Sequence, residues 1–384
     1  MTRTEQLLSD LIAIPSVNPA FAPAGAEAGA PSAAASRKIY GEEHVAAFLA
    51  AKARKAGLEI LAHGKGRSNL LVALQPKKRA KHTILLAPHL DTVVASDEQW
   101  IPRIKNGRMY GRGACDTKGS VAAMFSALCD LAHEKLRPAE TRIVFAGLID
   151  EEYAQAGSRA LADSGFQADL AIVGEPTRLQ VVTAHKGSLW LKIETRGRAA
   201  HGSTPHLGKN AVHAMARVVD LLESGYAAEL RQREHPLLGH ATVNVGQISG
   251  GTQPNIVPAA CTIAVDRRTV PGESDAGVCR EIAARLRAKK LPAIVSNTKL
   301  APAPALETNP ELPLVRQFFR AAGQTRPVGV DYFCDAAVLA AGGIPSVVFG
   351  PGDIAQAHTA DEWISLEQLE RGRNLLLKFL RATS

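Results

Sequence analysis

Short, largely apolar runs alternate with helical stretches along much of this chain, and this alternation strongly limits its fold. The runs, each expected to form a strand, lie at 69–74, 84–86, 141–149, 168–174 and 346–349. Helices are expected between and around them at 5–14, 41–56, 121–133, 158–164, 312–322, 336–341 and 366–381. An apolar run bounded by turn residues is typical of a strand buried on both faces of a parallel sheet. The order predicts an α/β fold with a doubly wound, largely parallel sheet.

The pattern changes near residue 184, where strands begin to alternate apolar and polar residues. Strands at 187–197, 241–251, 261–270 and 292–300 enclose helices at 210–223 and 274–289. This βαββαβ order is ferredoxin-like, and the alternation leaves one sheet face open, as in a small insert that packs on a partner. We therefore expect one domain over 1–183 and 303–384, interrupted by a smaller domain over 184–302 that packs on a partner.

Charge and composition exclude several function classes. The chain has 384 residues and a formal net charge of +8, but its basic residues are scattered. The densest cluster, at 77–81, precedes a strand and is expected to be a solvated loop. A nucleic-acid partner is therefore not expected, and the charge indicates only a mild attraction for anionic substrates.

Other segments indicate where the protein works. No run of about 18 apolar residues is present, so no membrane span is expected. The N-terminus resembles an amphipathic helix rather than a signal peptide, and the five cysteines lack CxxC spacing. We expect a cytoplasmic protein with free thiols. Residues 19–36, rich in Ala, Pro and Gly, predict a flexible surface loop.

Side chains suited to metal binding follow the apolar run at 84–86. The run ends at Pro88 and is followed by His89 and Asp91, and a glycine-flanked bend then presents Asp116. Open α/β sheets carry their chemistry at the carboxyl ends of their strands. His89 is therefore a candidate metal ligand, with Asp91 bonded to its other ring nitrogen.

Three further strand ends carry similar residues: Asp150-Glu151-Glu152, Glu175, and the segment that reaches His358. A single acid at a strand end is more often a helix cap or a solvated loop residue. Several such ends in one sheet favour a shared site. Two histidines and several carboxylates suit zinc, with one carboxylate bridging two ions.

The motifs PHLDTV, GRGACDTKGS, DEE followed by GS, VGEPT and FGPGDIAQAHTADEW occur in this order. Together they closely resemble the acetylornithine deacetylase and succinyl-diaminopimelate desuccinylase family of di-zinc metallohydrolases. Aminoacylases and glutamate carboxypeptidases of the same superfamily share the pattern. The likeness covers nearly the whole chain, and residues 19–36 are the part without a match.

The resemblance implies two zinc ions per subunit, held by His89 and Glu175, by Glu152 and His358, and by Asp116 as the bridge. Asp91 would orient His89, and Glu151 would be the general base. The family commonly has a cis peptide after the bridging aspartate, here Asp116–Thr117. The same ligands accept cobalt or manganese.

The resemblance also implies that 1–183 and 303–384 form the zinc-binding catalytic domain and that the insert, 184–302, is a lid and dimerisation domain. It adds three candidate residues in the insert. The residue matching His201 stabilises the oxyanion from the other subunit, and those matching Asn255 and Arg268 hold substrate. Arg268 shares a strand face with Asp266, whereas Arg267 points to the opposite face. The alternatives are that His201 is a surface-loop histidine and that Arg268 forms a structural ion pair with Asp266 or another acid.

The expected activity is metal-dependent hydrolysis of an amide bond next to a carboxylate, namely deacylation of an N-acyl amino acid. A dipeptidase or carboxypeptidase is the alternative enzyme. A non-catalytic binding protein is a third possibility, which loss of Glu151 or a ligand would have favoured, and none is missing. The expected partners are a small N-acyl amino acid or dipeptide and a second copy of the chain, bound through the lid domain.

Overall fold

The chain forms two compact units in the computed structural model, which describes residues 1–23, 39–63, 66–133 and 138–383. Unit 1 comprises Met1–Thr183, Thr308–Val328 and Cys334–Ser384, and unit 2 comprises Ala184–Glu307 and Gly329–Phe333. The predicted flexible loop at 19–36 lies outside the described residues from position 24 onward. Its first part forms a short 3-10 helix, Pro19–Phe21.

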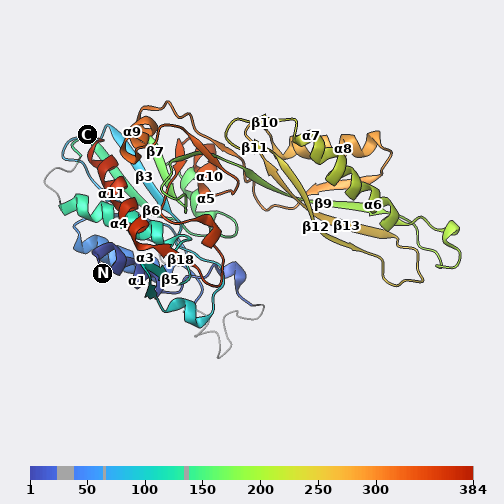
Figure 1. Cartoon of the computed structure of the whole chain (residues 1–384), viewed down its shortest axis with the longest axis horizontal. Coiled ribbons are helices and arrows are strands. Elements are labelled where there is room, and N and C mark those ends of the chain that lie inside the picture. Colours follow the sequence, from blue (N-terminus) through green and yellow to red (C-terminus); the bar gives the residue numbers. More distant parts are fainter. Residues whose placement is uncertain (24–38, 64–65, 134–137, 384) are drawn as a thin grey trace. The chain divides into compact units, whose positions relative to one another are not determined.

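Unit 1 is built on a mostly parallel sheet (Figure 1). Its strands, in spatial order, are β1 (Glu59–His63), β2 (Leu70–Leu74), β6 (Thr141–Gly147), β3 (His82–Pro88), β7 (Leu170–Gly174), β17 (Ser346–Val348) and β8 (Val182–His185). The neighbours from β6 to β17 pair in parallel, whereas β1, β2 and β8 pair antiparallel. The carboxyl ends of β6, β3, β7 and β17 therefore meet at one edge, and the predicted α/β fold is confirmed.

Helices cover both faces of this sheet because its central strands are apolar on both sides. Ile84 and Leu86 of β3 belong to one core, whereas Leu85 is equally buried on the other face. The first core contains α1 (Arg3–Ile12), α3 (Glu43–Lys55), α4 (Lys118–His133), α9 (Pro313–Ala322) and α11 (Leu366–Arg381). The other face is covered by α5 (Ala156–Asp163) and α10 (Asp335–Ala341).

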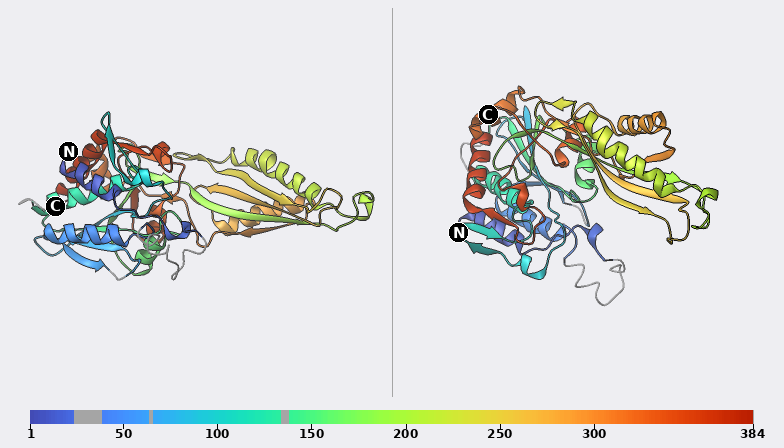
Figure 2. Two further views of the ribbon diagram at one scale, coloured as in Figure 1. Left: turned by 90° about the horizontal axis from the view of Figure 1, so that it is seen from below. Right: turned by 45° about the vertical axis from the view of Figure 1, so that its right-hand side comes forward.

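Unit 2 has the predicted βαββαβ order. Its elements are β9 (Gly187–Arg196), α6 (Ala211–Asp220), β12 (Thr242–Gly250), β13 (Ala260–Thr269), α8 (Asp275–Ala288) and β14 (Ala293–Asn297). The strands form an antiparallel sheet in the order β12-β13-β9-β14. The helices α6 and α8 share one core with the same sheet face, and Figure 2 shows them on that side. On the opposite face Trp190 remains exposed, so this face is open as the alternation predicted.

Some elements differ from the sequence predictions. The helix predicted at 210–223 continues through a π-helical turn (Leu221–Tyr226) into α7 (Ala227–Leu230). Strand β1 and a small sheet of β4 (Arg103–Lys105), β5 (Arg108–Tyr110) and β18 (Trp363–Ser365) were not predicted. Short strands in polar segments carry little periodic signal, because at most one described side chain in each of these strands is buried. In the described part of the chain, every helix is too short or too polar to cross a bilayer.

Candidate metal centre

His89 follows directly after β3 and is almost fully buried. Its Nδ1 lies 3.0 Å from the backbone oxygen of Asp91 and 3.4 Å from the Asp91 carboxylate. Two acceptors on this side favour a proton on Nδ1, which turns the Nε2 lone pair toward the candidate site. The predicted orienting residue is therefore beside the ring, with its backbone oxygen closer than its carboxylate.

Asp116 lies in a bend whose backbone N–H groups donate hydrogen bonds to one buried acid, Glu362. The carboxylate of Glu362 accepts hydrogen bonds from the backbone N–H groups of Gly113 (3.0 Å), Cys115 (2.8 Å) and Asp116 (3.0 Å). It also pairs with the Arg112 guanidinium at 2.7 Å. Gly113 adopts a φ of 79°, and a Cβ there would approach the Lys118 side chain to 2.9 Å. The Asp116–Thr117 peptide is cis, which confirms the expectation drawn from the resemblance.

The two carboxylate oxygens of Asp116 lie close to two different histidines. Its Oδ1 lies 3.1 Å from His89 Nε2, and its Oδ2 lies 3.3 Å from His358 Nε2. His358 Nε2 is also 3.1 Å from Oε2 of Glu152. The structure thus forms two groups able to hold a metal, His89–Asp116–Glu175 and Asp116–Glu152–His358. Within each group the ligand atoms lie within 4.8 Å of one another.

The carboxylate of Glu175 indicates that the first group suits a cation. Its Oε1 lies 4.0 Å from His89 Nε2 and is buried without a hydrogen-bond partner among the described residues. A buried carboxylate oxygen without a partner is unfavourable by about 1–3 kcal/mol or more. A divalent ion between Glu175, His89 and Asp116 would remove that cost.

Glu151 lies beside these groups without belonging to either. Its backbone N–H donates to Asp91 Oδ1 and that of Glu152 to Asp91 Oδ2, each at 3.1 Å. Burial, together with the charge of Glu175, raises the pKa of Glu151 well above its ordinary value. This carboxyl is therefore suited to holding a proton.

The histidine of the second group is strongly basic when only protein surrounds it. Hydrogen bonds to Asp116 and Glu152 raise the pKa of His358 to about 10. Burial opposes ionisation of Asp116, but the hydrogen bonds from His358 and His89 hold its pKa below the ordinary value. Burial raises the pKa of Glu152 in one group and of Glu175 in the other, so Asp116 is the carboxylate that favours the ionised form. A metal ion bound to either group would replace the protons held there.

The three candidates in the insert lie in unit 2. His201 Nδ1 accepts a hydrogen bond from the Ser203 N–H at 3.1 Å, which leaves the ring proton on the exposed Nε2. The loop of His201 pairs with that of Asn255, since Gly202 N–H donates to the Asn255 oxygen at 2.7 Å. His201 is therefore a possible hydrogen-bond donor, and Asn255 lies beside its loop.

Arg268 forms the ion pair that was the alternative to a substrate contact. Its Nε lies 2.9 Å from Asp266 Oδ2, and its side chain is one-third exposed. Arg267 points to the other face, is fully buried and pairs with Glu273, as the strand alternation predicted. The substrate role of Arg268 stays a prediction.

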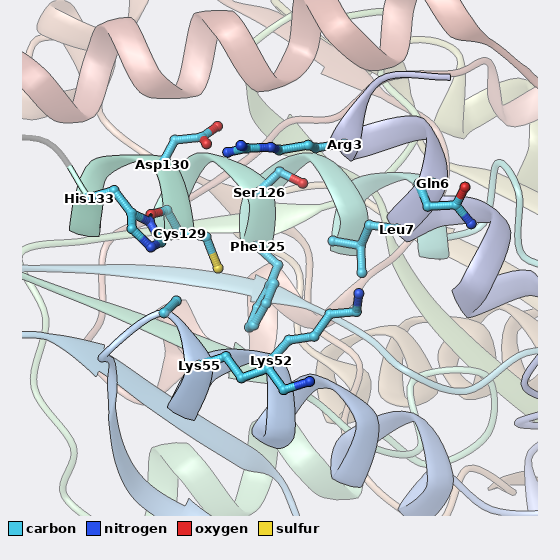
Figure 3. Close-up of a pocket in the computed structure, with 11 residues that line it drawn as sticks. Arg3, Gln6, Leu7, Lys52, Lys55, Phe125, Ser126, Cys129, Asp130 and His133 are labelled. Carbon is cyan, nitrogen blue, oxygen red and sulfur yellow. Dashed lines mark hydrogen bonds between the residues drawn. The ribbon is translucent and has the colours of Figure 1, made fainter.

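A separate cavity of about 460 Å³ lies between α1, α3 and α4 (Figure 3). Leu7 and Phe125 line it, together with the cations of Arg3 and Lys52. None of the candidate ligands lines it, and burial raises the pKa of its Cys129 thiol to about 12. A thiol with that pKa is a poor nucleophile, so Cys129 does not give this cavity a reactive group.

Known proteins resemble the chain over most of its length. Residues 85–382 match the model of peptidase family M20/M25/M40. The acetylornithine deacetylase of Myxococcus xanthus is 32% identical over 325 residues, covering 82% of this chain and 84% of the relative. Aminopeptidase PepT from Bacillus cereus has a TM-score of 0.78 at 24% identity, covering 99% of this chain and 97% of that one. A dinuclear metal-binding peptidase of the M20 family from Bacillus subtilis has a TM-score of 0.71 at 13% identity, covering 99% and 97%.

These similarities confirm the predicted resemblance to the acetylornithine deacetylase family. They also confirm a metal-dependent hydrolase that acts on amide bonds. The match spans the whole segment from β3 to α11 and thus both candidate ligand groups. The chain belongs to peptidase family M20/M25/M40.

Proposed function

We propose that this protein removes the acyl group from an N-acyl amino acid, with N-acetylornithine or a close analogue as substrate. The observation that carries the proposal is the pair of ligand groups sharing Asp116, with the half-buried Glu151 beside them. Identity of about 30% with acetylornithine deacetylases over about four-fifths of the chain supports this substrate class.

We propose two zinc ions as the metals, one held by His89, Asp116 and Glu175 and the other by Asp116, Glu152 and His358. Imidazole and carboxylate suit zinc, and they also accept cobalt or manganese. When bound, such ions polarise an amide carbonyl and lower the pKa of water toward neutrality. The unpaired oxygen of Glu175 supports this ligand set.

Glu151 is the proposed general base. Its carboxylate takes the proton from the attacking water and returns it to the leaving amine nitrogen. Asp91 orients both His89 and the backbone of Glu151, so one carboxylate aligns a ligand and the base. Burial, which raises the pKa of Glu151, favours proton transfer near neutral pH.

Residues of unit 2 are proposed to bind the reacting groups. His201 Nε2–H would donate to the developing oxyanion in the site of the partner subunit of a homodimer formed through unit 2. Arg268 would pair with the substrate carboxylate, because a guanidinium fork matches a carboxylate, and Asn255 would donate to the substrate. We also propose that the enzyme works in the cytoplasm.

A dipeptidase is the second candidate. Peptidases are among the solved structures that share this fold, including aminopeptidase PepT from Bacillus cereus. A free amino terminus on the substrate distinguishes this activity from deacylation. A hydrolysis screen that contains both N-acyl amino acids and dipeptides therefore separates the two functions.

The test is a hydrolysis screen of N-acyl amino acids and dipeptides, with zinc or cobalt added to chelator-treated protein. We expect N-acetylornithine or a close analogue to have the highest kcat/KM, and chelated protein to be inactive until metal is restored. Preferred cleavage of dipeptides would replace the deacylase proposal with the second candidate. Full activity after verified metal removal would contradict the metal-dependent mechanism.

A further inference from the structure

Five polar side chains, each from a different stretch of unit 1, meet at the loop that carries Glu151 and Glu152. We name them the Arg67 network, and its members are Asn18, Glu42, Arg67, Asp91 and Asp150. Apart from Arg67, whose side chain is 29% exposed, each is at most 3% exposed. Burying charge is costly unless it is paired, so a network of this kind needs a compensating benefit.

Arg67 joins two buried acids through one guanidinium. Its Nε lies 3.0 Å from Oε2 of Glu42 and its Nη2 lies 3.0 Å from Oε1, which is a two-pronged pair. The same Nη2 donates to Oδ1 of Asp150 at 2.7 Å. A lysine ammonium keeps the charge but lacks the planar fork that this arrangement uses.

Asp150 forms the backbone turn that immediately precedes Glu151 and Glu152. It has a φ of 68°, which is uncommon for a residue with a side chain. Its backbone N–H donates to Oε1 of Glu42 at 3.1 Å, and its Oδ2 accepts from the Ala156 N–H at 3.2 Å. Glu42 and Arg67 thus hold the left-handed turn immediately before Glu151.

Asn18 connects this turn to Asp91. Its amide nitrogen donates to Oδ2 of Asp91 at 2.7 Å and to Oδ1 of Asp150 at 3.0 Å. Asp91 in turn accepts the backbone N–H groups of Glu151 and Glu152. An unbroken series of contacts therefore runs from Arg67 to the backbone of the proposed base and of a proposed ligand.

We propose that Arg67 is a positioning residue, which acts through Asp150 and Glu42 to set the direction of Glu151 and Glu152. This inference rests on the proposed function for the roles of those two acids. Partners that orient metal ligands from outside the ligand set typically contribute about 10–100-fold to metal affinity or activity. Substitution of Arg67 should weaken metal binding more at the group that contains Glu152 than at the group that contains His89 and Glu175.

The experiment titrates metal-free protein with Co²⁺ and follows the visible absorption of the bound Co²⁺. It also measures kcat and KM where a substrate is known. Arg67→Met should lower Co²⁺ affinity at one of two sites by about 10–100-fold, with kcat reduced more than KM. The absorption spectrum of Co²⁺ at the unaffected site should match the spectrum of Co²⁺ bound to Glu152→Ala. The Co²⁺ affinity of Arg67→Lys should lie between that of Arg67→Met and that of the unmodified protein. If Arg67→Met does not fold, Arg67→Lys provides the test.

Arg373→Met is the matched control. Arg373 pairs through Nε with Asp130 at 2.9 Å, and both side chains are 24% exposed, close to the 29% of Arg67. That pair joins α11 and α4 and contacts none of the candidate ligands. This variant should bind Co²⁺ at both sites like the unmodified protein.

The double variant Glu42→Leu/Arg67→Met separates positioning from simple charge neutralisation. If Arg67 only compensates Glu42, removal of both restores Co²⁺ affinity, and the proposal is overturned. Unchanged Co²⁺ binding in Arg67→Met, or an equal loss in Arg373→Met, would also overturn it. The Co²⁺ titration needs no substrate, so it decides the role of Arg67 even if the proposed deacylase activity fails.

Discussion

Asp116 connects the two ligand groups, because each of its carboxylate oxygens faces a different histidine. His89 and Glu175 complete one group and Glu152 and His358 the other. This division of ligands determines how each substitution should change the metal content.

Glu152→Ala and His358→Ala should each reduce bound metal from about two ions toward one per chain, since each removes a ligand of one proposed ion. Asp116→Ala should remove most of both. Elemental analysis after equilibration with limiting zinc measures the content. Two retained ions in either single-group variant would show that the residue concerned is not a ligand.

Metal binding should release protons near neutral pH. Hydrogen bonds to Asp116 and Glu152 raise the pKa of His358 to about 10, so its imidazole is protonated in the metal-free protein. A metal ligand must be neutral imidazole, so binding expels that proton and affinity rises with pH up to about pH 10. Calorimetry in buffers of different ionisation enthalpy measures the release. His358→Ala should release fewer protons, and equal release would contradict the assignment.

The strand ends of unit 1 show which parts of the site the sequence can predict. The acids and histidines that follow β3, β6 and β7 were predicted together, because parallel strands bring their carboxyl ends to one edge. Glu362 lies inside the motif FGPGDIAQAHTADEW, but the motif alone does not predict its contacts. Its partner Cys115 is 247 positions away, and no local pattern predicts such a contact. The same holds for Asn18, Glu42 and Arg67, which come from polar stretches without periodicity.

Glu362→Ala should strongly destabilise unit 1. The substitution leaves Arg112 and three backbone N–H groups of the Asp116 bend without their acceptor. Breaking a buried ion pair costs about 3–5 kcal/mol. Urea unfolding of the metal-free protein measures the loss. Glu311→Ala, which removes the exposed pair with Arg316, should change the free energy by about 1 kcal/mol or less. Equal effects in the two variants would contradict the account of Glu362.

At the scale of the whole molecule, the insert is the part whose fold the sequence predicts well and whose proposed role depends on a partner subunit. Alternating strands and two amphipathic helices predicted its core, because every second side chain had to face those helices. No periodicity predicts which molecule meets its open face. The homodimer is therefore proposed from the resemblance and tested by subunit exchange.

Two inactive variants, Glu151→Gln and His201→Ala, should complement each other when mixed. In a mixed dimer one site carries both lesions and the other carries neither, if His201 serves the partner's site. Activity should then recover toward half of that of the unmodified dimer. The loss in His201→Ala alone should be about 3–4 kcal/mol in transition-state stabilisation. With subunit exchange verified, an absence of recovery would place His201 in its own subunit's site or outside the mechanism.

The central claim, that Glu151 moves the proton while its neighbours hold the metal, is tested most directly by Glu151→Gln. Metal content and turnover should be measured on the same preparation. The account predicts about two ions per chain, as in the unmodified protein, with turnover reduced about 10²–10⁴-fold or more. Near-normal turnover would remove Glu151 from the mechanism, and loss of metal would make it a ligand instead of the base.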